Sequence, residues 1–300
     1  MIGLIARRDR FAAAALIAAF SLTVTPSSGS AQTAVKGDAK RGEYVARLGG
    51  CHSCHTDHKK RGPSLAGGVT LKSPFGTFHV PNITPDKETG IGGWSEEDFI
   101  RAMTEGVAPD GSHYYPSFPY TSYTRMTRQD LVDLKAYLDA VQPVRKETPA
   151  HELSFPYNIR FMLGPWKWIF FDRGEFEPKP DRSGTWNRGA YIVTGPAHCG
   201  ECHTARNFFG ATSDDFALGG TRVGADGEPV PNITPHPKQG IGTWSSSDIE
   251  FALKSGMLPD GDFVGSSMAE MVENSSSHWT DADIKAVAEY LRSLPKRKTP

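Results

Sequence analysis

Two short segments of this 300-residue chain repeat one pattern of reactive side chains. Residues 51–55 are CHSCH and residues 199–203 are CGECH, so each segment is Cys-x-x-Cys-His. The chain has four cysteines, and these two segments hold all of them. The question is which chemistry needs two thiols three residues apart, followed at once by an imidazole.

Three chemistries compete for this pattern. Disulfides would use the cysteines but leave the histidine after each pair unexplained. A zinc site would require the two distant pairs to converge, and it also leaves both histidines unused. Covalent haem uses every residue, because thiols three apart lie on one face of a helical turn, add across the haem vinyl groups and present the next histidine to the iron. We therefore predict two haems c, with Cys51, Cys54, Cys199 and Cys202 as attachment points and His55 and His203 as proximal iron ligands.

The sixth iron ligand decides what such a site can do. Methionine raises the potential and suits electron transfer, whereas an open position permits catalysis. In the first half, Met126 directly precedes a predicted helix, and we expect it to bind iron; Met103 falls inside another predicted helix and is expected in the core. In the second half we favour Met268, which follows a Gly-Ser-Ser turn, over Met271, which falls within a predicted helical turn.

The chain is an internal duplication. Residues 81–111 and 231–261 align without a gap, and about half of the positions are identical. The similarity continues upstream through both cysteine motifs and downstream through the last predicted helix of each copy. The predicted fold is mainly α, with two tandem domains, each a small helical domain around a covalent haem. The predicted boundaries are 1–31 for a signal peptide, 32–142 for the first domain, 143–184 for an aromatic-rich linker, 185–295 for the second domain and 296–300 for a basic tail.

Helix positions follow from capping signals and periodicity. Residues 37–48 are predicted to form a helix that runs into the first motif. Ser-x-x-Asp at 95–98 and 245–248 predicts helix N-termini, because the serine side chain caps free amides and an acid favours the positive helix end. Thr-x-x-Asp at 127–130 and 280–283 predicts the start of the last helix of each copy, where leucine, isoleucine and valine keep helical spacing. The two PNITP segments must contain loops because of their prolines.

Two pairs of residues occupy matching positions in or just after the two PNITP segments. Trp94 and Trp244 occupy equal positions after Gly-Ile-Gly, and Asn82 and Asn232 lie within the two PNITP segments. An indole offers a large apolar face and one N–H donor, which suits a haem edge where porphyrin meets its propionates. We predict that these four residues help to hold the haems. The alternative for the tryptophans is ordinary packing between the loop and the following helix.

The N-terminus has the pattern of an export signal. Arg7, Arg8 and Arg10 precede an apolar run at 11–24 and a small-residue stretch at 29–31. The run is shorter than the roughly 20 residues that span a bilayer. We therefore expect a cleaved secretory signal and a periplasmic protein, with a retained membrane anchor as the alternative. The formal net charge of −1 gives no basis for nucleic acid binding.

The predicted linker contains an unusual concentration of aromatic side chains at 155–171, FPYNIRFMLGPWKWIFF. Its plain interpretation is packing between the two domains. The alternative is a docking surface for a partner protein or a membrane.

Three further segments carry a resemblance to a known family. They are residues 81–99, residues 109–126 (PDGSHYYPSFPYTSYTRM) and residues 267–291 (SMAEMVENSSSHWTDADIKAVAEYL). The chain resembles dihaem c-type cytochromes and is similar to the cytochrome c subunits of bacterial membrane-bound alcohol, aldehyde and gluconate dehydrogenases. The resemblance implies two class I cytochrome c-like domains, with Met126 and Met268 matching the axial methionines of the family. Those subunits usually carry three haems, whereas this chain has two attachment motifs.

The expected function is therefore electron transfer without a catalytic site of its own. The resemblance implies a periplasmic or membrane-bound dehydrogenase as donor. It implies quinone, a soluble cytochrome or a terminal oxidase as acceptor, with peripheral contact to the inner membrane. The alternative function is that of a dihaem cytochrome c peroxidase, which requires one iron with an open distal side and nearby acid–base groups.

Overall fold

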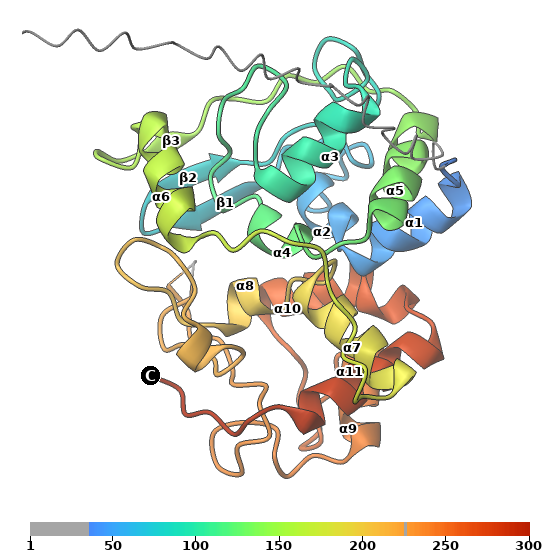
Figure 1. Ribbon diagram of the computed structural model, residues 1–300, viewed down its shortest axis with the longest axis vertical. Helices are drawn as coiled ribbons and strands as arrows, with labels where there is room; N and C mark the ends of the chain where they lie inside the picture. Colours follow the sequence, from blue (N-terminus) through green and yellow to red (C-terminus); the bar gives the residue numbers. More distant parts are fainter. Residues whose placement is uncertain (1–35, 225–226) are drawn as a thin grey trace, which may run out of the picture. The chain divides into compact units, whose positions relative to one another are not determined.

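The computed structural model describes residues 36–224 and 227–300. Helices are the main secondary structure of these residues, and their strands form one small sheet (Figure 1). The mainly α fold is as predicted. The predicted signal peptide at 1–31 lies outside the described residues, as does the start of the first predicted domain. Among the helices described, none is both long and apolar enough to cross a bilayer.

The later helices of the first half begin where the capping signals predict, and the first begins at Ala39, two residues after its predicted start at 37. Asp38 accepts hydrogen bonds from two amides at the start of the first helix, Ser95 and Asp98 form a capping box, and Thr127 caps the last helix of this half. The elements are α1 (Ala39–Leu48), α2 (Cys51–His55), α3 (Glu96–Glu105), α4 (Tyr120–Tyr123) and α5 (Arg128–Ala140).

The second half repeats this order with one change. Ser245 and Asp248 form the second capping box, Thr280 caps the last helix, and both PNITP segments are non-helical as expected. Where the first half has the four-residue α4, the second half has a nine-residue helix, which spans both Met268 and Met271. The elements are α7 (Gly184–Thr194), α8 (Gly200–His203), α9 (Ser246–Ser255), α10 (Ser266–Asn274) and α11 (Asp281–Ser293), with short 3₁₀ turns η2 (Asp214–Phe216) and η3 (Ser276–His278).

The first and last helices of each half cross at a glycine. In Figure 1, α1 lies beside α5, and α7 beside α11. A Cβ atom at Gly42 would lie 1.8 Å from the carbonyl oxygen of Asp133, and one at Gly189 would lie 1.9 Å from that of Ala286. Only glycine allows this approach of two backbones. Each crossing places the helix that leads into a cysteine motif directly against the last helix of its half.

A small antiparallel sheet accompanies the first half and was not predicted. It contains β1 (Thr70–Ser73), β2 (Gly76–His79) and β3 (Glu152–Leu153), in that order. In the second half, the corresponding stretch makes an isolated bridge between Thr221 and Val230, and its described residues form no strand. Strands this short carry too few residues for a clear alternation, and the third strand is supplied from the linker, so the sequence pattern alone was too weak to indicate them.

The linker packs on both halves, as the plain interpretation expected, although Phe155, Phe161 and Trp168 of its aromatic run are exposed. It contains β3, η1 (Arg160–Met162) and α6 (Leu163–Phe170). Leu163 joins Phe78 and Tyr115 of the first half in a small core. The Lys167 ammonium donates to the carbonyl oxygens of Glu105 and Gly106, at 2.8 and 2.6 Å, and so caps the end of α3. On the other side, Phe176 stacks edge-on against Tyr191 of the second half.

The two halves join through a reciprocal pair of tyrosine contacts. Tyr44 on α1 donates to Asp283 on α11 at 2.7 Å, and Tyr191 on α7 donates to Asp130 on α5 at 2.5 Å. The amide of the threonine that caps each of these last helices donates to the same tyrosine oxygen, at 3.0 and 3.3 Å. The contact is therefore the same in both directions, as at the interface of a two-fold symmetric dimer.

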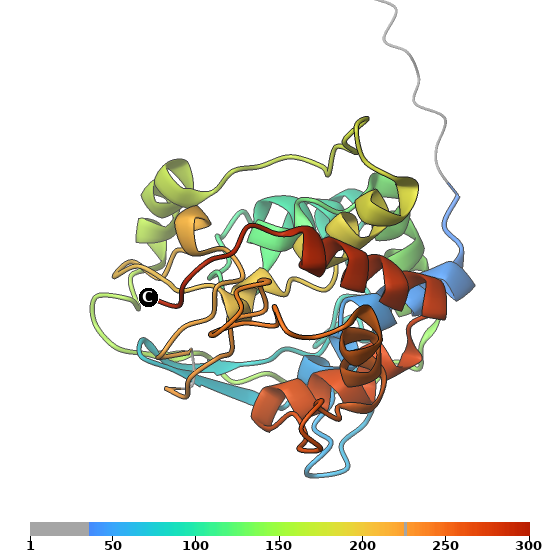
Figure 2. The ribbon, with the colours of Figure 1, turned by 90° about the horizontal axis from the view of Figure 1, so that it is seen from below.

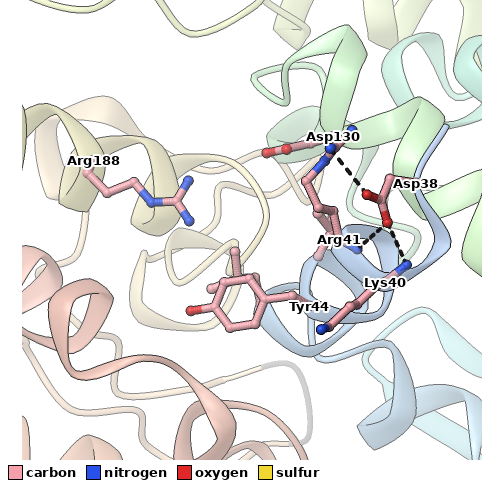
Figure 3. A pocket seen from close by; sticks show the side chains of 8 residues that line it. Asp38, Lys40, Arg41, Tyr44, Asp130 and Arg188 are labelled. Carbon is pink, nitrogen blue, oxygen red and sulfur yellow. Dashed lines mark hydrogen bonds and ion pairs between the residues drawn. The ribbon is translucent and has the colours of Figure 1, made fainter. Parts of the chain in front are cut away.

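A cavity of about 420 Å³ lies beside Tyr44 at this junction (Figure 3). Its two arginines already have partners. Arg41 bonds to Asp38 at 3.3 Å and to Asp133 at 2.8 Å. Arg188 bonds to Asp283 at 2.8 Å. The arginines therefore hold α1 to α5 and α7 to α11, and the charged lining, which also includes Lys40, does not suit an apolar ligand.

Candidate haem-binding sites

Each cysteine motif starts with a residue in the left-handed backbone region. Gly50 has φ of 60°, and the matching residue before the second motif, His198, has φ of 39°. This turn redirects the chain from α1 into α2 and from α7 into α8. As a result, the two cysteines and the histidine of the first motif lie within α2. In the second motif Cys199 is the N-cap of α8, which carries Cys202 and His203.

The two histidines predicted as proximal ligands are oriented by backbone carbonyls. Nδ1 of His55 lies 2.8 Å from the carbonyl oxygen of Pro81, and Nδ1 of His203 lies 2.7 Å from that of Pro231. A carbonyl oxygen can only accept, so Nδ1 carries the proton and Nε2 keeps its lone pair for a metal. Burial lowers the pKa of His55 to about 4 and also lowers the pKa of His203. Both imidazoles are therefore neutral and suited to bind iron.

The cysteines lie in apolar surroundings. Burial raises the pKa of Cys51 and Cys199 to about 12, and that of Cys54 to about 11. A structural zinc site needs four ligands that converge on one ion, whereas each motif supplies at most two thiols and one imidazole. Nor does any group of three or more His, Cys, Asp or Glu side chains in the described part of the chain lie where it could hold a metal ion. Cys51, Cys54 and Cys199 are partly buried and Cys202 is exposed. Such thiols beside a neutral, oriented imidazole fit a large apolar ring that is attached through thioethers.

Asn82 holds the loop that orients His55. Its amide group donates to the carbonyl oxygen of Val144 at 2.7 Å and to Thr89 at 3.2 Å. Its carbonyl oxygen accepts from the amide and hydroxyl of Thr84, at 3.0 and 2.8 Å. The buried side chain thus clamps the PNITP loop to the chain that follows α5. Direct contact between Asn82 and haem stays a prediction.

The second half repeats this clamp with the C-terminal residues. Asn232 donates to the carbonyl oxygen of Arg297 at 2.7 Å and accepts from the amide and hydroxyl of Thr234, at 2.8 and 2.7 Å. Thr299 bonds to Gly219 at 2.8 Å. The segment predicted as a basic tail therefore packs against the second PNITP loop, in the place that Val144 occupies in the first half. Haem contact by Asn232 also stays a prediction.

Replacing Asn82 with alanine should lower the stability of the holoprotein by about 1–3 kcal/mol, because the substitution leaves buried partners without a hydrogen bond. Thermal unfolding followed by far-ultraviolet circular dichroism measures the effect. Asn158 is exposed on the linker, and its replacement by alanine should change stability by no more than about 0.5 kcal/mol. Equal melting temperatures for the two variants would contradict the clamp.

One core cluster gathers several predicted residues of the first site. Met126, which is 3% exposed, belongs to a cluster against which Cys51 and Trp94 also pack. In the second half, Trp244 and Cys199 pack against the equivalent cluster. The tryptophans therefore lie in the same apolar environment as the first cysteine of each motif. Their contact with haem, and iron ligation by Met126, stay predictions.

The two candidate methionines of the second site occupy different surroundings. Both lie in α10, so Met268 is helical rather than part of a flexible turn. A Cβ atom built at Gly50 would lie 2.7 Å from the sulfur of Met271, which places that sulfur at the start of the first cysteine motif. Met271 is thus engaged with the first half. Met268 stays the predicted ligand of the second iron.

A buried carboxylate that sequence reasoning missed links the two sites. Glu201, inside the second motif, accepts from Thr121 and Ser122 of the first half, at 2.7 and 2.9 Å, and from Arg206 at 2.6 Å. Burial opposes its ionisation, but Arg206 and the two hydroxyls outweigh burial and lower the pKa of Glu201. The carboxylate thus fixes α4, which leads directly to Met126. A lone glutamate between two cysteines gave no signal of this in the sequence.

The two attachment motifs lie next to one another. The ring of His198 packs edge-on against Tyr123 at 5.5 Å between centroids, and its Nε2 lies 3.3 Å from the carbonyl oxygen of Gly49. The thiol of Cys202 is close enough to Cys54 to contribute to the raised pKa of Cys54. Groups attached at these two motifs would therefore be neighbours.

Comparison with known proteins identifies the family. The family model described as Cytochrome c matches residues 39–142 and residues 187–295. This chain belongs to the cytochrome c family. The cytochrome is 43% identical over 269 residues to a diheme cytochrome c-type protein of Cereibacter sphaeroides, which covers 86% of each chain.

Longer relatives are subunits of dehydrogenases. The cytochrome is 40% identical to the cytochrome c subunit of the alcohol dehydrogenase (quinone) of Gluconacetobacter polyoxogenes and 39% identical to the fructose dehydrogenase cytochrome subunit of Gluconobacter japonicus. These matches cover 95% and 94% of this chain but only 60% and 58% of the relatives. The predicted resemblance to dihaem cytochromes and dehydrogenase cytochrome subunits is confirmed.

Proposed function

We propose that this cytochrome is a periplasmic electron-transfer protein with two covalently attached haems, and that it carries electrons from a partner dehydrogenase towards the respiratory chain. One arrangement supports the proposal above all. Two cysteine motifs lie side by side, and each has a neutral histidine held by a proline carbonyl. Bound haem supplies one-electron iron chemistry; the protein holds each group in place and keeps water away from it.

The adjacency of the motifs favours a relay over two independent sites. The thiol of Cys202 is close enough to Cys54 to help raise the pKa of Cys54, and Glu201 fixes the loop of the first site from within the second motif. Thr121, Tyr123 and His198 fill the region between the motifs. Such a fixed geometry suits electron passage because neither half has to move.

A dehydrogenase donor is supported by the relatives, which include cytochrome subunits of alcohol, fructose and gluconate 2-dehydrogenases. The acceptor in this proposal is quinone, a soluble cytochrome or a terminal oxidase. Because Met126 lies buried beside the first cysteine motif, a closed sixth position is favoured over the open iron that a peroxidase needs.

The test supplies the purified holoprotein as sole electron acceptor to dehydrogenase catalytic subunits that lack their own cytochrome subunit. Reduction of both haems when a dehydrogenase receives its substrate is the expected result, followed in the visible haem bands. Haem analysis should give two haems per chain. Failure of every dehydrogenase to reduce the protein, together with rapid turnover of hydrogen peroxide, would replace the proposal with the peroxidase function.

A further inference from the structure

The linker helix α6 presents an apolar face that nothing in the described chain covers. Its inward face is defined by contacts, since Leu163 lies in a core and Lys167 caps α3. At 100° per residue, the opposite face carries Trp168 and Ile169, with Phe161 just before the helix. These three side chains are 87%, 61% and 81% exposed. Exposure on this scale is unusual for large apolar side chains that lie together.

A loop of the second half extends this face. The Trp166 indole donates to the carbonyl oxygen of Phe209 at 2.8 Å, and the rings of Phe170 and Phe209 lie 5.8 Å apart. Figures 1 and 2 both show α6 beside the loop that follows α8. Phe208 and Phe209 in that loop are 80% and 60% exposed. We call the set the aromatic surface; it comprises Phe161, Met162, Trp168, Ile169, Phe208 and Phe209.

The segments that carry the aromatic surface contain cations and no carboxylates of their own. Residues 153–171 contain Arg160 and Lys167, and residues 202–213 contain Arg206. Lys167 caps α3 and Arg206 is paired with Glu201 at 2.6 Å, so Arg160 is the exposed cation of these two segments, and exposed Asp214 and Asp215 follow the second. The hairpin of β1 and β2 lies beside this loop, because a Cβ atom at Gly210 would lie 3.1 Å from the ring of Phe75. Residues 58–85, which include this hairpin, also lack Asp and Glu. Asp172, which follows α6, is paired with Arg125 at 2.6 Å.

We propose that the aromatic surface docks on an anionic phospholipid bilayer. Protruding aromatic side chains beside the exposed cations Arg160 and, on the hairpin, Lys72 suit the headgroup region of such a membrane. A protein partner suits the surface less well. Protein interfaces carry about one hydrogen bond per 100–200 Å², whereas the six side chains of the aromatic surface offer the indole of Trp168 as their one hydrogen-bonding group. The loop with Phe208 begins directly after His203, so docking here brings the second haem motif to the membrane surface.

The test measures binding of the holoprotein to vesicles by sedimentation, with phosphatidylcholine alone and with phosphatidylcholine plus phosphatidylglycerol. We expect binding to the anionic vesicles that weakens as salt is raised. A double variant, Phe161→Ser with Trp168→Ser, should bind at least about tenfold more weakly, because burial of each ring is worth about 1.5–3 kcal/mol. The single change Trp168→Phe should retain most of the binding.

The matched control is Phe251→Ser. Phe251 is 54% exposed on α9, outside the aromatic surface, and its loss should leave vesicle binding unchanged. All variants keep the same N-terminus, so a retained apolar leader would affect them equally. Equal binding by the double variant and the control, or no binding of the parent protein to anionic vesicles, would overturn the proposal. A third outcome would also overturn it: the parent protein binds no vesicles, but the double variant no longer forms a complex with a dehydrogenase. That result would assign the surface to a protein partner.

This proposal rests on the proposed function only for the benefit of docking, which would place the cytochrome near electron acceptors in the membrane. The two can fail separately. Vesicle binding needs no electron transfer, and the double variant should keep the haem potentials and the reduction by a dehydrogenase in solution.

Discussion

Replacement of Met126 by alanine should lower the reduction potential of one haem by about 0.1–0.2 V, within the roughly 0.8 V range that axial ligands span. A thioether favours reduced iron, and water or a foreign ligand in its place does not. The weak far-red absorption band of methionine-ligated haem should fall by half, while attachment through Cys51 and Cys54 stays intact. A redox titration with denaturing haem-stained gels measures all three effects.

Met268→Ala should produce the same drop at the other haem, independently of the first. Met271→Ala is the control in the same helix. Its sulfur lies against Gly50, so its loss should cost packing energy and leave both potentials within experimental error. If Met271→Ala lowers a potential and Met268→Ala does not, the ligand assignment in the second half is wrong.

Gly189→Ala should destabilise the protein by at least about 3 kcal/mol, because the new methyl group would collide with the backbone of α11 rather than with a flexible side chain. The distance of 1.9 Å between a Cβ atom at Gly189 and the Ala286 carbonyl oxygen cannot be increased without separating the two helices. Gly42→Ala should have an equal effect in the first half. Chemical denaturation of the holoprotein gives the free energies of unfolding.

Gly184 provides the comparison within the same helix, α7. A Cβ atom there meets nothing within 4 Å, and Gly184→Ala should be neutral or stabilise the protein by up to about 1 kcal/mol. A cost for Gly189→Ala no larger than that for Gly184→Ala would mean that α7 and α11 do not cross at this residue.

Much of the fold was predictable because its signals are local. The capping pairs Ser95–Asp98 and Ser245–Asp248 fix helix starts through neighbouring residues alone. The cysteine motifs likewise carry their chemistry within five residues. The hairpin was missed because two four-residue strands and a third from the linker give almost no periodic signal.

Parts of the sites depend on contacts between residues far apart in the chain. The proline carbonyls that orient His55 and His203 are backbone groups and leave no trace in residue type. The bonds of Glu201 to Thr121 and Ser122 cross between the halves. One available signal was overlooked. Arg-Gly-x-Tyr occurs at 41–44 and again at 188–191, and it marks both the helix crossings and the tyrosines of the junction.

The reciprocal tyrosine contacts also bear on the origin of the chain. An ancestor with a single copy could have formed a homodimer through this same surface, because Tyr44 to Asp283 and Tyr191 to Asp130 are one contact used twice. Fusion of two genes would then have replaced association at cellular concentrations by the much higher effective concentration that a linker provides. In a two-fold symmetric contact the same surface is used on both copies, so a pair leaves no such surface free. The assembly therefore closes at a pair, and the two halves were free to diverge, one acquiring a hairpin and the other the longer helix α10.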